Sequence, residues 1–129
     1  MDPQSLIANS ALDSKLGLVI ESATPTEVVG RAPVAGNTQP AGLWHGGASG
    51  IMIESLASIA ATLHAGNSAM AVGTELNVSH LSSARGGWIH GTARAVHLGH
   101  SSTVHQVDLV NDEGNTIATG RVTCRLLPA

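Results

Sequence analysis

The chain has 129 residues and is 43% hydrophobic but only 12% charged, so length and composition predict one globular domain, residues 1–129, and exclude a disordered chain. Its net charge is −3, and its 6 Lys and Arg residues give no basic surface for nucleic acid. Phe and Tyr, on which bases would stack, are absent, so we expect no nucleic-acid partner.

The first half of the chain predicts short elements followed by one long helix. A short helix is expected over residues 5–14, and the loose alternation over 16–31 indicates one or two strands. Residues 37–42 form a Gly- and Pro-containing turn. A helix over about 46–64 is predicted, because four apolar residues recur at the helical spacing: Met52, Leu56, Ile59 and Leu63.

The second half of the chain reads as strands and turns. Strands are predicted over residues 71–81, 88–97, 101–110 and 116–127, with a hairpin turn over 111–115. We expect these four strands to form a meander that buries one face against the long helix, which is an α+β architecture.

The single cysteine and the N-terminus bear on the compartment. Cys124 excludes an intrachain disulfide, and its strand-like surroundings indicate a buried thiol without a catalytic role. The N-terminus lacks the basic and apolar regions of a signal peptide, and the apolar stretches read as too short to span a membrane. We therefore predict a cytoplasmic protein with no membrane partner.

Glu54 is the most unusual residue of the sequence. It is the only Asp, Glu, Lys or Arg between Arg31 and Glu75, and no basic residue lies one helical turn away. A semi-buried carboxylate is costly unless it is hydrogen-bonded or paired. The motif His45-Gly46-Gly47 opens the same helix, so a polar, glycine-rich helix entry precedes an isolated acid. Such an arrangement suits a small active site.

These motifs resemble the hotdog-fold acyl-CoA thioesterases. The His-Gly-Gly motif, Glu54 and the downstream stretches 73–77 and 97–99 carry the resemblance, which covers roughly residues 16–127. The chain is most similar to the branch with the dihydroxynaphthoyl-CoA, one type of hydroxybenzoyl-CoA and the enterobactin proofreading thioesterases, since the phenylacetyl-CoA type typically has Asp at the Glu54 position. The resemblance implies an antiparallel sheet wrapped around one long central helix, and hydrolysis of an acyl-CoA, more so an aromatic than a fatty one.

The resemblance also implies roles for five residues. Glu54 matches the catalytic carboxylate, which acts as nucleophile or as general base for water. Gly46 matches the glycine whose backbone N–H polarises the thioester carbonyl. Gln39 and His45 match a polar pair near the thioester, and Ser58 matches a hydroxyl that positions the water or the acyl ring. The family assembles as a dimer of dimers, and its active sites form between two subunits.

The spacing along the predicted helix agrees with a shared site. Glu54 lies roughly 11 Å along the axis from the helix entry, at about 1.5 Å per residue. One reacting atom cannot touch both places in the same subunit.

Further residues are expected to contact the substrate. Gly47 lets it approach the backbone without a Cβ in the way, and Trp44 is a candidate wall of the acyl pocket. The resemblance places coenzyme A near two groups of residues: His80, Ser82, Ser83 and Arg85, and His97, Gly99 and Ser101. The resemblance implies that the substrate is an acyl-CoA or acyl-carrier-protein thioester. No histidine spacing indicates a metal site, and no cofactor is expected beyond the coenzyme A of the substrate.

Two other functions remain open from the sequence. In a hotdog hydratase or dehydratase acting on acyl thioesters, His45 and Glu54 would move protons as a histidine–acid pair. A non-catalytic acyl-CoA-binding protein would use the same fold without hydrolysis. The complete motif and the presence of Glu54 favour hydrolysis over both.

Overall fold

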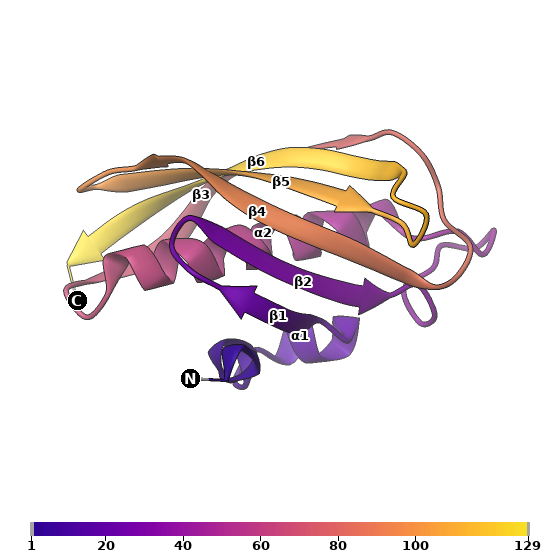
Figure 1. Cartoon of the computed structure of the whole chain (residues 1–129), viewed down its shortest axis with the longest axis horizontal. Helices are drawn as coiled ribbons and strands as arrows, with labels where there is room; N and C mark the ends of the chain where they lie inside the picture. Colours follow the sequence, from indigo (N-terminus) through magenta and orange to yellow (C-terminus); the bar gives the residue numbers. More distant parts are fainter. Residues whose placement is uncertain (1, 129) are drawn as a thin grey trace.

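The computed structural model describes residues 2–128 and shows an antiparallel sheet curved around one long helix (Figure 1). The elements, in chain order, are the 3-10 helix η1 (Pro3–Ile7), α1 (Ala11–Leu16), β1 (Val19–Ala23), β2 (Glu27–Pro33), α2 (Gly46–Ala65), β3 (Ala69–His80), β4 (Trp88–Leu98), β5 (Ser102–Val110) and β6 (Thr116–Pro128). The predicted hotdog architecture is confirmed, and every predicted strand exists within two or three residues of its expected bounds.

The strand order corrects the predicted four-strand meander. The order across the sheet is β1-β2-β4-β5-β6-β3, so only β4, β5 and β6 form a meander. Strand β3 pairs along its whole length with β6, from Ala69 opposite Pro128 to His80 opposite Ala118, and occupies the far edge. The chain then crosses the sheet to reach β4. Local sequence patterns do not determine which strands pair, because pairing depends on contacts between distant segments.

The N-terminal segment also differs from its prediction. The expected helix over residues 5–14 is divided into η1 and α1. Ser10 caps α1 by accepting a hydrogen bond from the Asp13 backbone N–H (3.3 Å), and Gly17 ends it with φ at 79°. Ser is a strong N-cap, so it starts a new helix where an average over the segment suggests a continuous one. η1 packs against β1, and α1 packs against α2 (Figure 1).

The core lies between α2 and the sheet. In the predicted apolar stripe of α2, Met52 and Leu56 are fully enclosed, Ile59 is buried and Leu63 is partly buried. Gly91 of β4 lies beneath them, and a Cβ at this position would be 2.6 Å from Leu56 Cδ1, so the absent side chain lets the helix approach the strand closely. Helix α2 is long and apolar enough to cross a membrane by length and composition alone, although the apolar stretches were predicted to be too short; here it packs against the sheet as a core helix.

Strand β3 presents an exposed edge. None of its twelve residues is buried, and two large apolar side chains, Met70 (56% exposed) and Leu76 (40% exposed), are open to solvent. An unpaired strand edge with apolar side chains is a ready template for another strand.

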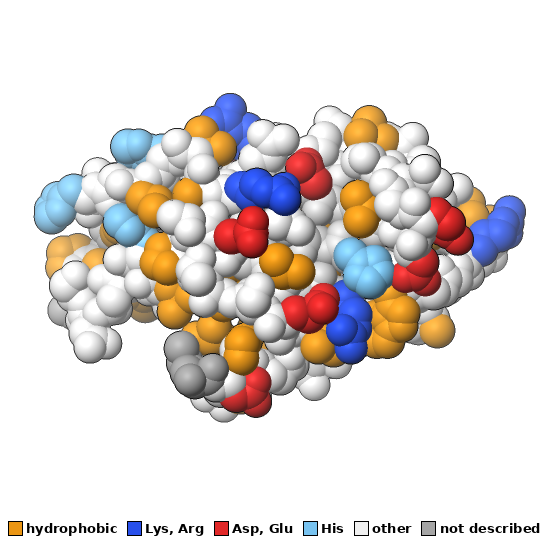
Figure 2. All heavy atoms as spheres, in the orientation of Figure 1, with side chains coloured by type: hydrophobic (Ala, Val, Ile, Leu, Met, Phe, Trp, Pro, Cys, Tyr) orange, Lys and Arg blue, Asp and Glu red, His pale blue; other side chains and the backbone are white. Residues whose placement is uncertain are grey.

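Charges of both signs alternate on the surface. Figure 2 shows acidic and basic side chains side by side and no continuous basic area on the face shown. Arg94, for example, makes exposed contacts with Glu27 and Asp108. Histidines gather toward the end of the molecule at which β4 turns into β5.

Candidate active site

The start of helix α2 presents a free backbone donor. His45 is the N-cap, and its Nδ1 accepts a hydrogen bond from the Gly47 N–H (2.8 Å). The His45 carbonyl accepts from the N–H groups of Ala48 and Ser49. Within residues 2–128 the Gly46 N–H has no hydrogen-bond partner, so it is the open donor at the positive end of the helix dipole.

The hydrogen bond of His45 also sets its tautomer. Because Nδ1 accepts from Gly47, the neutral ring carries its proton on Nε2 and can donate from there. The His80 ring, at the end of β3, lies against Gly46, where a Cβ would be 2.9 Å from His80 Cε1. His80 was expected near coenzyme A, and the fold adds that it stands at the helix entry.

Gln39 lies in the loop that precedes α2. Its Oε1 accepts from the N–H of Ala41 (2.5 Å) and more weakly from that of Leu43 (3.4 Å), which leaves its amide NH₂ to donate. Asn37, which the sequence analysis did not single out, holds this loop. The Asn37 side-chain Nδ2 donates to Leu16 O (2.8 Å) and Pro33 O (2.7 Å), and the Asn37 backbone carbonyl accepts from the His45 N–H (2.9 Å). An Asn in a turn is a common feature, so no sequence signal distinguished it.

Glu54 points out of α2 toward β3. It is exposed in the single chain, which corrects the expected semi-buried setting, and among the described residues it makes no hydrogen bond or ion pair. Its Oε2 lies 3.1 Å from the position that a Cβ on Gly73 would take. Gly73 thus leaves room for the carboxylate beside the strand.

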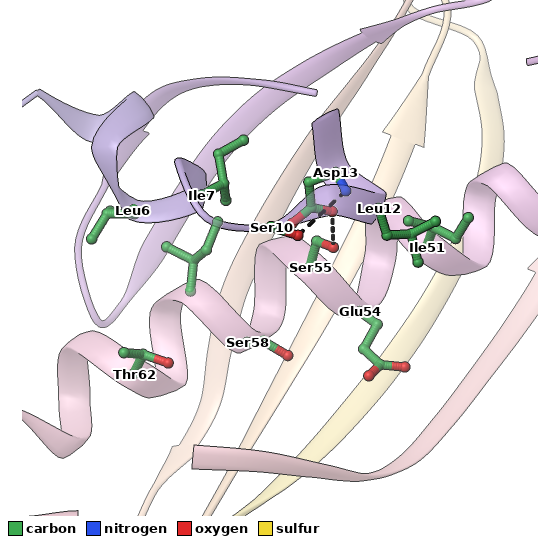
Figure 3. A pocket seen from close by; sticks show the side chains of 11 residues that line it. Leu6, Ile7, Ser10, Leu12, Asp13, Ile51, Glu54, Ser55, Ser58 and Thr62 are labelled. Atoms are coloured by element: carbon green, nitrogen blue, oxygen red, sulfur yellow. Dashed lines mark hydrogen bonds between the residues drawn. The ribbon is translucent and has the colours of Figure 1, made fainter. Parts of the chain in front are cut away.

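Glu54 lines a cavity of about 320 Å³ between α2 and the N-terminal helices. Figure 3 shows Ser58 and Glu54 on the side of α2 nearer β3, and Ser55 on the side that faces α1. The residues that line the cavity are Leu6, Ile7, Ser10, Leu12, Asp13, Ile51, Glu54, Ser55, Ser58, Ile59 and Thr62. The cavity combines apolar walls with hydroxyl and carboxylate groups, as small-molecule sites do.

The comparisons with known proteins decide the family. Residues 41–118 match the family model described as Thioesterase superfamily. The chain belongs to the thioesterase superfamily. It is 38% identical over 96 residues to the 1,4-dihydroxy-2-naphthoyl-CoA hydrolase of Escherichia coli K12, covering 74% of this chain and 71% of that protein. It is 31% identical to the proofreading thioesterase EntH of Klebsiella pneumoniae, covering 93% and 88%.

A solved structure agrees with this assignment. A variant of thioesterase PA1618 from Pseudomonas aeruginosa superimposes with a TM-score of 0.93 at 32% identity, covering 100% of this chain and 96% of that one. The protein is therefore an acyl-CoA thioesterase with the hotdog fold, as the sequence motifs indicated.

In this thioesterase Trp44 belongs to the core. It is 6% exposed, and its indole N–H donates to Ser49 Oγ (2.7 Å) beneath the first turn of α2. Trp44 is not among the residues that line the cavity beside Glu54, so the structure does not place it in a wall of that cavity.

Cys124 lies beneath α2 and is buried, as predicted. Burial raises the pKa of its thiol, an effect that the neighbouring Ser58 hydroxyl partly offsets. Ser58 therefore has a neighbour in the core as well as a place in the cavity.

The two groups of residues that were expected to bind coenzyme A lie at opposite ends of α2. The loop with Ser82, Ser83 and Arg85 lies at the helix entry, where the backbone N–H of Trp44 donates to Ala84 O (2.8 Å) and Ser82 Oγ donates to Thr116 O (2.6 Å). The turn with His97, Gly99 and Ser101 lies at the other end, where His64 Nε2 contacts Gly99 O (2.8 Å). A 20-residue helix separates them by about 30 Å, so one chain does not bring the two groups together. Among residues 2–128, no three His, Cys, Asp or Glu side chains are placed to hold a metal ion.

Proposed function

We propose that this thioesterase hydrolyses aromatic acyl-CoA thioesters to the free acid and coenzyme A. In this proposal Glu54 acts as nucleophile or general base, and the Gly46 N–H donates a hydrogen bond to the thioester carbonyl. Gln39, His45 and Ser58 orient the thioester and the attacking water. The observation that carries the proposal is the open Gly46 N–H at the start of α2, in the same helix that presents the unpaired Glu54.

Thioester hydrolysis places negative charge on the carbonyl oxygen as the tetrahedral intermediate forms. A fixed N–H donor at a helix N-terminus stabilises this charge, and removal of one such donor typically costs about 3–4 kcal/mol in the barrier. A carboxylate activates water by taking its proton, or attacks the carbonyl carbon itself. The site thus offers both groups that the reaction needs.

The two groups lie too far apart to act within one chain. Gly46 and Glu54 are eight positions apart in α2, roughly 12 Å along the helix axis. We propose that a second subunit completes the site.

The exposed edge of β3 supports a specific arrangement of that dimer. Helix α2 runs alongside β3 so that Gly46 lies beside His80 and Glu54 beside Gly73. If two β3 edges pair antiparallel about an axis between Leu76 and Asn77, Gly73 of one chain faces His80 of the partner subunit. The same pairing brings Glu54 toward Gly46 of the partner subunit. It also covers the exposed Leu76 side chain.

Two observations support an aromatic acyl group. The cavity beside Glu54 has apolar walls formed by Leu6, Ile7, Leu12 and Ile51, and its volume of about 320 Å³ suits a compact ring system better than a long fatty chain. In addition, the Escherichia coli relative is named as a naphthoyl-CoA hydrolase. The nucleotide part would then contact the loop at 82–85 and the turn at 97–101, contributed by different subunits.

Steady-state hydrolysis of aromatic and aliphatic acyl-CoAs, followed by thiol release, tests the activity. We expect aromatic substrates to turn over fastest and Glu54→Ala to lower kcat at least about 100-fold. Glu113→Ala, in the exposed hairpin turn, is the matched carboxylate control and should behave as wild type. Failure of the folded wild type to hydrolyse any thioester would contradict the proposal.

Complementation tests the shared site. Glu54→Ala and Gly46→Val are each expected to be inactive, since the valine side chain would meet the His80 ring. After the two variants are unfolded together and refolded, mixed dimers contain one intact site, and activity should return to about a quarter of wild type. No recovery, with dimers shown by light scattering, would mean that each chain holds its own complete site.

A further inference from the structure

The single thiol of the chain lies in the core beneath the part of α2 that carries Glu54. Cys124 is 1% exposed in β6, where it pairs with Thr103 of β5 on one side and with Gly73 of β3 on the other. Gly73 is the residue beside which the Glu54 carboxylate lies. Cys124 is therefore one strand in from Glu54, and it belongs to the buried cluster between the sheet and α2.

The hydroxyl of Ser58 is not held by its own helix. Ser58 lies one helical turn after Glu54 on the same side of α2, and both residues line the cavity (Figure 3). A serine hydroxyl in a helix commonly donates to the backbone carbonyl four residues back, which here is that of Glu54. Among residues 2–128 the Ser58 hydroxyl makes no hydrogen bond with nitrogen or oxygen, whereas the Ser55 hydroxyl is bound to Asp13. Another group must therefore set the direction of the Ser58 O–H.

A buried hydroxyl approaches the thiol from the sheet. Thr103 is fully buried, and within the described residues its Oγ1 has no hydrogen-bond partner of normal geometry. A buried hydroxyl in this state is uncommon. The polar side chain opposite it in the sheet is the Cys124 thiol, whose sulfur is a weak acceptor and whose S–H is a weak donor.

The two hydroxyls act on the thiol from different elements, Ser58 from α2 and Thr103 from β5. Burial raises the pKa of Cys124, the hydroxyls of Ser58 and then Thr103 lower it by smaller amounts, and the charge of Glu54 has the smallest effect and raises it. The thiol therefore keeps its proton in the folded protein. Because the sulfur is the acceptor that faces the Thr103 O–H, the S–H is left to donate toward Ser58 Oγ.

We propose that Cys124 is a positioning residue, whose S–H donates to Ser58 Oγ and so turns the Ser58 O–H into the cavity beside Glu54. This inference rests on the proposed function, because it gives the Ser58 hydroxyl its direction in hydrolysis. A hydroxyl that accepts a hydrogen bond on its core side keeps its own proton for an acceptor in the cavity. Cys124 itself touches neither substrate nor water, and its thiol neither gains nor loses a proton.

The S–H stretching band in Raman spectra tests the contact without any turnover. Cys124 is the only cysteine of the chain, so the band belongs to it alone. Donation to Ser58 weakens the S–H bond and lowers its stretching frequency, so Ser58→Ala should move the band to higher frequency. Ser55→Ala, at the serine on the side of α2 that faces α1, is the matched control and should leave the band at its wild-type position. A band that does not move in Ser58→Ala would overturn the inference.

A double-mutant cycle in kcat tests the positioning role. We expect Cys124→Ala to lower kcat about 3- to 10-fold with KM near the wild-type value, since a group at the site would shift by less than about 1 Å. Cys124→Ser keeps a donor at the same place and should keep kcat near the wild-type value. In the Ser58→Ala background, Cys124→Ala should cause no further loss of kcat, because the two residues act as one unit.

Val122→Ala separates positioning from packing. Val122 is 1% exposed, two residues before Cys124 in β6 and on the same face, so its replacement should lower stability without lowering kcat. Equal losses of kcat in Cys124→Ala and Val122→Ala, or a loss in Cys124→Ala that persists in the Ser58→Ala background, would overturn the inference. A band that moves in Ser58→Ala, in a protein that hydrolyses no thioester, would support the contact and refute the proposed function instead.

Discussion

Replacement of Gly73 by alanine tests whether the position of Glu54 matters for turnover. The added Cβ would lie 3.1 Å from Glu54 Oε2, 3.6 Å from its Cδ and 3.9 Å from its Cγ. Favourable contacts between heavy atoms lie at about 3.5–4.0 Å, so the carboxylate must move by a few tenths of an ångström. The φ of Gly73 is not positive, so the backbone itself accepts alanine without strain.

The expected result separates activity from stability. A misplacement of about 1 Å in a catalytic group can cost about 100-fold, so a shift of a few tenths of an ångström should lower kcat about 3- to 10-fold. Alanine in a strand is more favourable than glycine by about 0.5–1 kcal/mol, so the free energy of unfolding should not fall. Hydrolysis of an aromatic acyl-CoA and urea unfolding give the two quantities.

The matched control is Gly86→Ala. Gly86 has no positive φ, and its added Cβ would meet no atom within 4 Å, so both activity and stability should stay as in wild type. If Gly73→Ala kept wild-type kcat, Glu54 would not need its observed position beside β3. If Gly73→Ala lost stability and activity together, its effect would be on the fold, and it would give no support for a positional role of Gly73 beside Glu54.

Two further substitutions and one labelling experiment test the core. Gly91→Ala should lower the free energy of unfolding by about 1–3 kcal/mol in urea titrations, because its Cβ would meet Leu56 at 2.6 Å and Leu109 at 2.8 Å; a neutral effect would mean that helix and strand separate easily. Burial lowers the pKa of His105 from 6.5; the hydrogen bond to the Pro25 carbonyl raises it, and His64 lowers it further by a smaller amount. The folded state therefore favours the neutral ring. The stability that His105 contributes is fully present above pH 6.5 and is lost as pH falls through the folded-state pKa. His105→Gln should flatten the pH dependence of unfolding below pH 6.5, and an unchanged slope would assign it to other groups. Cys124, whose pKa burial raises, should react with a thiol reagent only after unfolding; rapid labelling of the folded protein would contradict its burial.

The sequence determined the elements that have a local pattern. The helix from Gly46 to Ala65 follows from apolar residues at the helical spacing, and its end follows from Gly66, which has φ at 64°. Strand β5 was predicted from its sequence, and it buries alternate residues, including Thr103 and His105. The family could also be predicted from the sequence, because the His-Gly-Gly motif and Glu54 lie close together in one helix.

The sequence alone was less reliable where a residue's surroundings come from elsewhere. Trp44 was a candidate for a pocket wall because it stands beside His45, yet its indole N–H donates to Ser49 in the first turn of α2 and the ring is buried in the core. Glu54 was expected to be semi-buried because its neighbours in sequence are apolar, yet it is exposed in the single chain. Burial depends on which face of the helix meets the sheet.

Sequence by itself therefore determined the elements, the helix entry and the family of this thioesterase, since each depends on residues within a few turns or on a contiguous motif. Only the tertiary structure decided that β3 forms the open edge, that Gly73 lies beside Glu54 and His80 beside Gly46, and that Asp13 bonds to Ser55 across 42 positions. The physical reason is that these contacts join segments far apart in the chain. Their free energy depends on how the whole sheet closes around α2, which no local pattern encodes.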